Sequence, residues 1–241
     1  MKVAIILNCG TQIKRKINAD KVIACDGGFN VCPVEPDIIL GDFDSMQKPE
    51  GVDIPIVEHD THKNASDGEL AVYYAKEELN ADEITIYGVT GGRIDHVLCN
   101  LAIMRLAHTL GMKVKAEEDG LDIYYVEGKF DMPTQKGETI SILPYGSSAI
   151  VTDSENLEYP LDELMLKFIA SPFTRSQIFW TNSSLEAEIF FFLPPSISKR
   201  TTSTNSRIIA FLVKTTAFIS IKSKYFTYEK PTFTSEFPVQ R

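Results

Sequence analysis

The stretch Ile38–Ser45, Ile-Ile-Leu-Gly-Asp-Phe-Asp-Ser, joins a short apolar run to two acidic residues. The apolar run has the length and composition of a buried strand. In an extended chain, residues i and i+2 point to the same side, so the carboxylates of Asp42 and Asp44 are expected to face one spot. Two adjacent carboxylates repel unless a cation lies between them, and Mg²⁺ suits this pair because it takes one or two carboxylates. The alternative is a turn in which the Asp residues cap local backbone groups.

Further apolar runs on both sides of this stretch alternate with segments of helical spacing. Helices are expected from Ser66 to about Leu79 and from about Asp95 to Thr109. Such alternation is typical of an α/β domain with a mainly parallel sheet. The residues expected to bury the second helix are Val97, Leu98, Leu101, Ala102 and Met104. The expected strands are Lys2–Leu7, Lys21–Ala24, Ile38–Leu40, Ile54–Val57, Ile84–Tyr87, Met112–Ala116 and Leu121–Val126.

The motif Asp26-Gly27-Gly28 directly follows the second expected strand. Its glycines allow the backbone to turn sharply and to approach a ligand closely. A plain turn at the end of a strand explains the same residues. The position of the motif nevertheless favours a ligand site, because α/β proteins bind ligands at the carboxyl ends of their strands.

The motif Ser66-Asp67-Gly68-Glu69 has the form of a capping box at the start of a helix. Asp67 and Glu69 would then lie in the first helical turn. They either complement the helix dipole or form a second carboxylate cluster that faces Asp42 and Asp44 across a metal site. The sequence alone leaves both readings open.

The segment Gly88–Gly92 connects a strand to a helix and is rich in glycine. Such a turn places backbone N–H groups and a helix N-terminus at one point, which suits a phosphate group. Arg93 adds a bidentate phosphate donor. The spacing matches neither a dinucleotide fingerprint nor a P-loop. His96, which follows, is more typical of a structural hydrogen-bonding residue than of a catalyst.

Composition limits the classes of function. The formal net charge of -9 disfavours a general nucleic-acid binder and fits an enzyme that holds anionic substrates through metal ions. No N-terminal signal and no apolar run of membrane-spanning length is present, so no membrane partner is expected. The four cysteines show neither zinc-site nor disulfide spacing, which indicates reduced thiols and a cytoplasmic protein.

The pattern changes after Gly128. Helical periodicity fades, and short strand-like runs such as Thr139–Leu143 and Ala149–Thr152 take its place. We therefore expect an α/β domain over residues 1–127, followed by a smaller antiparallel β domain over residues 128–195.

The remaining residues, 196–241, form an atypical tail. All 14 glycines lie at or before Gly146, and residues 171–241 contain 9 Lys and Arg against 4 Asp and Glu. Residues 169–241 are either a natural extension that adds strands to the β domain or the product of an altered reading frame near Phe168. For residues 196–241, disorder is a further alternative. Sequencing the gene across the Phe168 codon tests for an altered reading frame. A single-base shift that restores a Gly-x-Ser-Asn-Glu segment would identify it.

Four motifs now stand in order along the chain, at Asp26, Gly41, Ser66 and Gly91. The ordered set, Asp-Gly-Gly, Gly-Asp-Phe-Asp-Ser, Ser-Asp-x-Glu and Gly-Gly-Arg-Ile-Asp-His, resembles thiamine pyrophosphokinase (thiamine diphosphokinase). The resemblance extends over residues 1–167. It includes Asn156–Leu161, which is similar to the Gly-Leu-x-Tyr-Pro-Leu segment of that family.

The resemblance implies transfer of a diphosphoryl group from the co-substrate ATP to thiamine, with Mg²⁺ as cofactor and AMP as the second product. It also implies a C-terminal β-sandwich that binds thiamine, an N-terminal domain that binds ATP and Mg²⁺, and a homodimer with sites at the interface. Carried over by motif, Asp42, Asp44 and Asp67 are the catalytic and metal-binding residues. The ATP-binding residues would be Asp26, Gly27, Gly28, Glu69, Gly91, Gly92, Arg93 and Asp95.

Three departures from the family pattern affect these expectations. Asn64 replaces an Asp, which weakens one contact to metal or water. The segment between Gly28 and Gly41 is short, so a helix there is expected to be cut down. The Gly-x-Ser-Asn-Glu segment that helps to hold thiamine is not found cleanly. Its candidate replacements are Ser176, Thr181 and Asn182.

Two other functions fit the same residues. One is a Mg²⁺-dependent hydrolase or transferase that acts on another nucleotide or alcohol. The other is a nucleotide-binding module without catalysis, which Asn64 and the altered C-terminal motif favour.

Overall fold

A computed structural model describes residues 1–44, 46–59, 65–134, 138–145, 148–155, 157, 161, 163–166, 178–180 and 207–223. Its α/β part contains β1 (Lys2–Ile6), β2 (Lys21–Cys25), α1 (Gly28–Val31), β3 (Ile38–Gly41), β4 (Ile56–Glu58), α2 (Asp67–Glu77), β5 (Glu83–Tyr87), α3 (Ile94–Thr109) and β6 (Lys113–Glu118). The elements that follow are β7 (Leu121–Thr134), β8 (Thr139–Pro144), β9 (Ala149–Glu155), β10 (Leu164–Leu166), β11 (Ile178–Trp180) and β12 (Arg207–Ser223).

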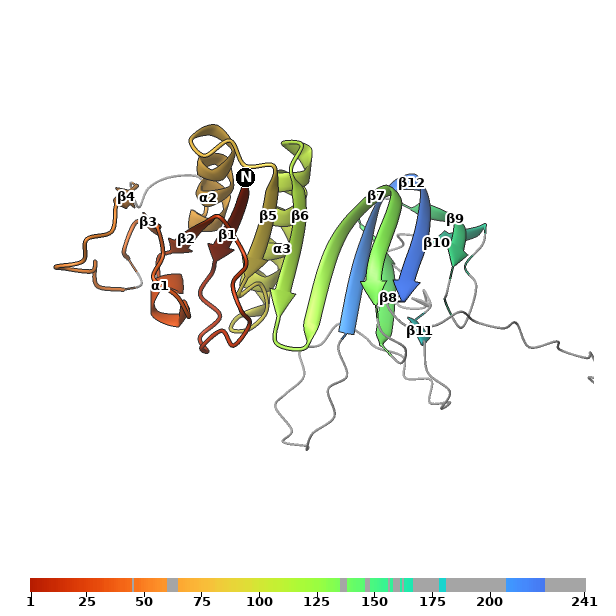
Figure 1. The fold of residues 1–241 in the computed structure, drawn as a ribbon, viewed down its shortest axis with the longest axis horizontal. Helices are drawn as coiled ribbons and strands as arrows, with labels where there is room; N and C mark the ends of the chain where they lie inside the picture. The colour runs from red at the N-terminus through yellow and green to blue at the C-terminus, as the bar shows by residue number, and fades with distance from the viewer. Residues whose placement is uncertain are drawn as a thin grey trace, which may run out of the picture.

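The α/β part is built on a parallel sheet (Figure 1). Its strands lie in the order β4-β3-β2-β1-β5-β6, and every neighbouring pair is parallel. The predicted strands and the predicted fold class of this part are confirmed. The order reverses between β1 and β5, because β2, β3 and β4 extend the sheet on one side of β1 while β5 and β6 extend it on the other.

Both faces of this sheet are covered, which explains why its strands are continuous apolar runs. One face, with Val3 and Ile5 of β1, packs in a core with residues of α2 and α3. The other face, with Ala4 and Ile6, packs against Val31 of α1 and against residues of the β1–β2 connection. Each of these four β1 side chains is fully buried, and burying one Ile stabilises the fold by about 1.5–3 kcal/mol.

The two long helices begin close to where the sequence predicts. Ser66 caps α2, since its hydroxyl accepts a hydrogen bond of 3.3 Å from the backbone N–H of Glu69. On α3 the predicted burial is confirmed for Val97, Leu101 and Met104.

The predicted burial of Leu98 and Ala102 on α3 is wrong. Leu98 is 56% exposed, and Ala102 is also exposed. Residues four apart lie on one helical face, so these two share a stripe with Ile94 that points away from the sheet. Apolar residues of α3 therefore extend onto a face of the helix that the α/β part does not bury.

Strand β7 joins the two parts of the chain (Figure 1). It pairs antiparallel with β6 through a tight turn and then runs past Gly128 as one strand of 14 residues. Tyr125 belongs to the first core, whereas Val126 belongs to a second core with Met132 and Ile140. The change of core therefore falls close to the boundary predicted near Gly128, although the domain limits themselves stay a prediction.

The β part contains the antiparallel pairs β9–β10 and β8–β11. Strand β12 is parallel to β7, β8 and β9, and this central strand comes from residues assigned to the tail. The antiparallel pairs agree with the predicted second domain, whereas the position of β12 was not predicted. The origin of the tail stays a question for the gene sequence.

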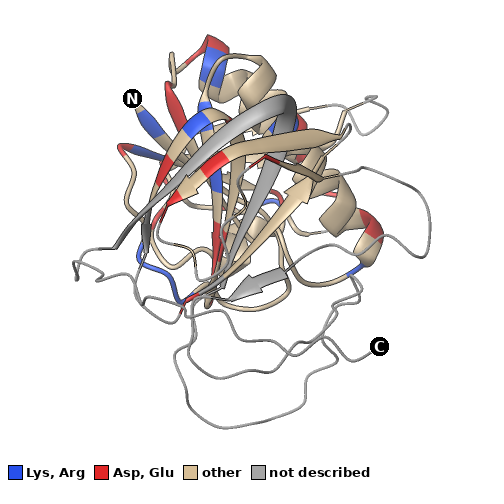
Figure 2. Cartoon of the chain, turned by 90° about the vertical axis from the view of Figure 1, so that its right-hand side faces the viewer, with Lys and Arg blue, Asp and Glu red and all other residues tan. Residues whose placement is uncertain are grey.

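Three further features concern the described residues only. None of their helices combines the length and the apolar character that a bilayer span requires. The four cysteines, all among the described residues, form no disulfide, and Cys9 and Cys25 are buried. Acidic and basic residues both occur along the described strands (Figure 2), and Lys2 of β1 forms an ion pair with Glu83 of the neighbouring β5 at 3.3 Å.

The ion pair between Lys21 of β2 and Asp37, the residue before β3, gives a pH prediction. Asp37 accepts hydrogen bonds from Lys21 Nζ at 2.7 Å and from the backbone N–H of Val22 at 2.8 Å. Burial raises the pKa of Asp37, but the bonds from Lys21 and Val22 outweigh it, so the pKa lies below its usual value of 3.8. A lowered pKa means that the charged carboxylate stabilises the fold above about pH 4, and that this stability is lost as the pH falls through the lowered value.

We therefore expect Asp37→Asn to lower the free energy of unfolding by up to about 1 kcal/mol at pH 7. The difference from the wild type should shrink toward pH 3. Urea unfolding of both proteins at several pH values measures it. A difference that stays constant or grows at low pH would contradict this role of the carboxylate.

Candidate active site

The candidate site lies at the carboxyl edge of the parallel sheet. In open α/β sheets, ligands bind outside the carboxyl ends of the strands, where the strand order reverses. Here that reversal falls between β1 and β5. The segments that leave β1, β2, β3 and β5 at this edge include three of the four predicted motifs, and the fourth forms the start of α2.

Asp26 stands at the end of β2 and is tied to the neighbouring strand. Its backbone N–H donates to the carbonyl oxygen of Leu40 at 2.8 Å. The residue is 8% exposed, and its φ of 42° is in the left-handed region, which is costly for a residue other than glycine. Such strain is characteristic of functional sites, because the surrounding structure must enforce it.

The two glycines after Asp26 lie in close contact with β1 and the chain that leaves it, Gly27 with a side chain and Gly28 with the backbone. A Cβ on Gly27 would lie 2.3 Å from the side-chain nitrogen of Asn8, and one on Gly28 would lie 2.2 Å from the carbonyl oxygen of Ile6. The Asp-Gly-Gly motif therefore packs directly on the chain that leaves β1. The helix that follows, α1, has only 4 residues, which confirms the shortening expected from the sequence.

The second motif continues from β3 beside Asp26. A Cβ on Gly41 would lie 3.1 Å from the Cβ of Asp26, so Asp42 follows directly from this contact. The extended conformation predicted for this motif is wrong, because Phe43 has a φ of 58°. The backbone N–H of Asp44 donates to Asp42 Oδ1 at 3.2 Å, so Asp42 caps the turn as in the alternative considered from the sequence.

Asp67 lies at the same edge but at the start of a helix, whereas the first two motifs follow the ends of strands. It is the first residue of α2, and its carbonyl oxygen accepts a hydrogen bond from Cys25 Sγ at 3.8 Å. Cys25 is the residue before Asp26, so the start of α2 lies over the end of β2. Asp67 and Glu69 are half-buried in the first helical turn, where their charge also complements the helix dipole.

The fourth motif begins at the end of β5 and is exposed from Gly91 to Asp95. Arg93 Nε donates to Asp95 Oδ1 at 3.1 Å, and Arg93 Nη2 donates to Asp95 Oδ2 at 2.5 Å. The hydrogen bond from Arg93 keeps the pKa of Asp95 below its usual value. A phosphate group bound by Arg93 would have to compete with this carboxylate, so the predicted role of Arg93 stays a prediction.

The residues at this edge suit Mg²⁺ in type but do not form a closed metal site. Among the residues that the structure describes, no three Asp, Glu, His or Cys side chains form a group that could hold a metal ion. Mg²⁺ needs only one or two carboxylates when water and phosphate oxygens complete its shell. The carboxylates of Asp42, Asp44 and Asp67 are the ligand type that a site of that open kind requires. The predicted sharing of one ion by Asp42, Asp44 and Asp67 stays a prediction.

Two elements of the site were missed by sequence reasoning. The first is the segment 8–12, which leaves the central strand β1 at the point where the strand order reverses. It packs against both glycine motifs, since a Cβ on Gly91 would lie 2.8 Å from the carbonyl oxygen of Cys9. The strand order would have pointed to this segment, but that order is not visible in the sequence.

The second missed element is Glu118 at the end of β6. Its Oε1 accepts hydrogen bonds from the backbone N–H groups of Val89 at 2.5 Å and Thr90 at 3.2 Å. No sequence signal marks this residue, because it is far from the glycine-rich loop along the chain.

Several predicted residues lie outside the described part of the chain. These are Ser45, Asn64 and the candidate thiamine-binding residues Ser176, Thr181 and Asn182. Their roles stay predictions.

Comparison with known proteins agrees with the motifs. Residues 14–116 match the family model described as thiamin pyrophosphokinase, catalytic domain. The resemblance to the thiamine pyrophosphokinase family is confirmed. The matched residues contain all four motifs and the segments that connect them.

A thiamine pyrophosphokinase from Bacillus subtilis (strain 168) is 29% identical to this chain over 155 residues, which cover 61% of this chain and 70% of that protein. Two crystal structures support the fold. Thiamine pyrophosphokinase from Bacillus subtilis has a TM-score of 0.55 at 18% identity and covers 75% of this chain and 88% of its own. A thiamin pyrophosphokinase family protein from Enterococcus faecalis has a TM-score of 0.54 at 20% identity, with coverages of 77% and 89%.

Proposed function

We propose that this chain transfers a diphosphate group from ATP to the hydroxyl group of thiamine, giving thiamine diphosphate and AMP. The observation that carries the proposal is the match of residues 14–116 to the thiamin pyrophosphokinase catalytic domain. The position of the motifs at the carboxyl edge of the sheet supports it, because that edge is where α/β proteins bind nucleotides.

Phosphoryl-type transfer asks a protein mainly for positioning and for neutralisation of charge. Carboxylates alone would repel a polyphosphate, so we propose Mg²⁺ as cofactor, held by Asp42, Asp44 and Asp67. When bound, Mg²⁺ supplies positive charge to the phosphate oxygens of ATP. The chain itself contributes the orientation of ATP through the Asp-Gly-Gly turn, Glu69 and the glycine-rich loop.

One carboxylate is also proposed to accept the proton of the thiamine hydroxyl, and Asp67 is the candidate. We expect Asp67→Asn to lower the turnover number by about a hundredfold at saturating Mg²⁺, because general-base catalysis contributes about 10²–10⁴-fold. The rate of AMP release with thiamine measures it. Near-normal turnover of this variant would remove Asp67 from the role.

The remaining expectations belong to the same proposal. Residues 1–127 would bind ATP and Mg²⁺, residues 128–195 would bind thiamine, and the functional unit would be a homodimer. We also propose a cytoplasmic location, as the spacing of the four cysteines in the sequence predicts. Light scattering of the purified chain at several concentrations tests the dimer.

A panel of substrates tests the proposal as a whole. The purified chain is incubated with ATP, Mg²⁺ and thiamine or another primary alcohol, and the release of AMP is followed. AMP release that requires thiamine supports the proposal. AMP release with another alcohol instead, or ATP binding without AMP release, would replace it with one of the two alternative functions.

A further inference from the structure

Three kinds of contact fix Val89 and Thr90, which form the first half of the glycine-rich loop Gly88–Gly92. The side chain of Val89 is fully buried. The backbone N–H groups of Val89 and Thr90 donate to Glu118 Oε1, and the carbonyl oxygen of Val89 accepts a hydrogen bond of 3.1 Å from Asn100 Nδ2 on α3. The peptide groups at residues 89 and 90 are therefore fixed by side chains from β6 and α3.

The second half of the loop is open. Gly91 and Gly92 are exposed, and their φ values of 112° and 63° belong to the region that favours glycine. Because Val89 and Thr90 already donate to a carboxylate, their N–H groups are engaged before any ligand arrives. A phosphate group at this loop would use the later N–H groups and the start of α3.

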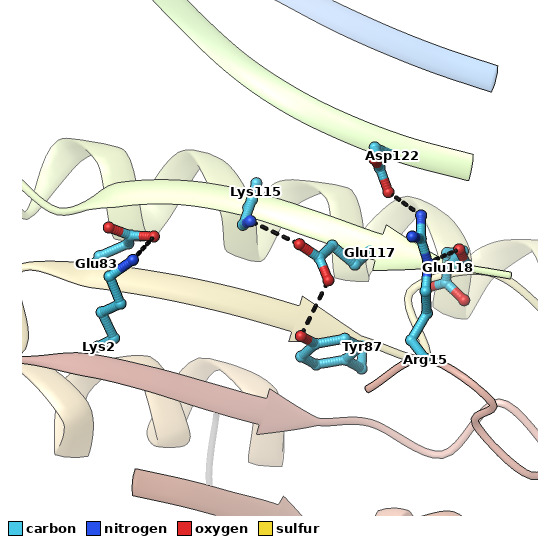
Figure 3. A network of polar contacts seen from close by, with 8 residues as sticks. All are labelled: Lys2, Arg15, Glu83, Tyr87, Lys115, Glu117, Glu118 and Asp122. Carbon is cyan, nitrogen blue, oxygen red and sulfur yellow. Dashed lines mark hydrogen bonds and ion pairs between the residues drawn. The ribbon is translucent and has the colours of Figure 1, made fainter. Parts of the chain in front are cut away.

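Glu118 is itself held in place (Figure 3). Its carbonyl oxygen accepts a hydrogen bond from Arg15 Nε at 2.7 Å, and Arg15 also forms an ion pair with Asp122 on β7. Burial raises the pKa of Glu118, while the N–H groups of Thr90 and Val89 act in the opposite direction. The carboxylate is thus a half-buried partner of the loop and not a charge that faces water.

We propose that Glu118 is a positioning residue that sets the conformation of the loop Gly88–Gly92 and thereby the affinity of the chain for ATP. This inference rests on the proposed function for the identity of the ligand. Glu118 acts through the loop, since its hydrogen bonds end on the loop's backbone. When residues 89 and 90 are fixed, Gly91 and Gly92 are held in one arrangement before ATP binds. The free energy of ATP binding is then not reduced by the entropic cost of ordering these residues.

The test compares three variants of the full chain. Glu118→Ala removes the acceptor, Glu118→Gln keeps an acceptor oxygen for the same two N–H groups, and Glu117→Gln is the matched control. Glu117 is the preceding residue of β6, and it contacts Tyr87 at 3.1 Å and Lys115 at 2.6 Å instead of the loop (Figure 3).

We expect Glu118→Ala to raise the KM for ATP by about tenfold or more, with the KM for thiamine unchanged. Glu118→Gln and Glu117→Gln should stay close to the wild type. A purely structural role would instead lower the active fraction, and so kcat, at unchanged KM. An unchanged KM for ATP in Glu118→Ala would overturn the proposal. A lowered KM for ATP would also overturn it. It would mean that a phosphate group of ATP binds better once the N–H groups of Val89 and Thr90 no longer donate to Glu118.

Amide hydrogen exchange tests the same inference without activity. In the folded wild type, the amides of Val89 and Thr90 should exchange more slowly than those of Gly91 and Gly92, and Glu118→Ala should remove this protection. Equal exchange at all four amides of the wild type would overturn the proposal even where Glu118→Ala does not fold. If the wild type forms no AMP, the proposed function fails, while exchange and the dissociation constant for ATP still decide the role of Glu118.

Discussion

Asp42→Asn is expected to lower the rate of AMP formation from ATP and thiamine by about a hundredfold or more, because charge stabilisation by a bound metal is worth several kcal/mol. Asp42 follows β3 at the carboxyl edge, and Asn removes its charge while keeping its shape. The Asn side-chain oxygen still accepts the hydrogen bond that Asp42 Oδ1 receives from the backbone N–H of Asp44. The turn should therefore persist, and the loss should appear in activity and not in stability.

The matched control for this variant is Asp53→Asn. Asp53 is exposed in the connection between β3 and β4, and it belongs to none of the four motifs. Its substitution removes the same charge and should leave the rate within about twofold of the wild type. An Asp42→Asn protein that keeps a comparable rate at saturating Mg²⁺ would exclude Asp42 from the site.

Gly88→Ala should lower the free energy of unfolding by about 3 kcal/mol or more, from two effects that add. The φ of Gly88 is 78°, which an alanine adopts only with strain. A Cβ at this position would also lie 2.3 Å from the carbonyl oxygen of Leu7, a backbone atom of the chain that leaves the central strand. Relief of that contact would push β1 and β5 apart at the switch point of the sheet.

Gly111→Ala separates the two effects. Gly111 has nearly the same φ, 80°, but no atom lies within 4 Å of the position that a Cβ would take. This variant should lose only about 1 kcal/mol, the cost of the backbone conformation. Urea unfolding measures both proteins. Equal losses in the two variants would show that the contact of the added Cβ with the carbonyl oxygen of Leu7 does not contribute to the loss.

Local signals account for the parts of the fold that the sequence predicts. The apolar runs of the parallel strands and the Ser66 cap act over a few residues, so they can be recognised without knowledge of the rest of the chain. The four motifs were also recognisable locally, and the sheet brings them to one edge because parallel strands all end there.

Other features depend on contacts that no local pattern contains. The turn at Asp42 follows from the left-handed conformation of Phe43, which the alternating acidic residues do not reveal. Arg93 was expected to be available to bind a phosphate group, but it already donates a hydrogen bond to the carboxylate of Asp95. Glu118 meets the glycine-rich loop only because β6 lies beside β5. Likewise, the place of β12 between β7 and β9 results from pairing between distant segments.

The transfer of a diphosphate group is tested most directly by ATP labelled in its β-phosphate. The purified full chain is incubated with this ATP, thiamine and Mg²⁺, and the products are separated over time. The account predicts that the label enters thiamine diphosphate and that one AMP forms for each molecule of that product. Label that remains in ADP, or a folded chain that forms no labelled thiamine compound, would contradict it.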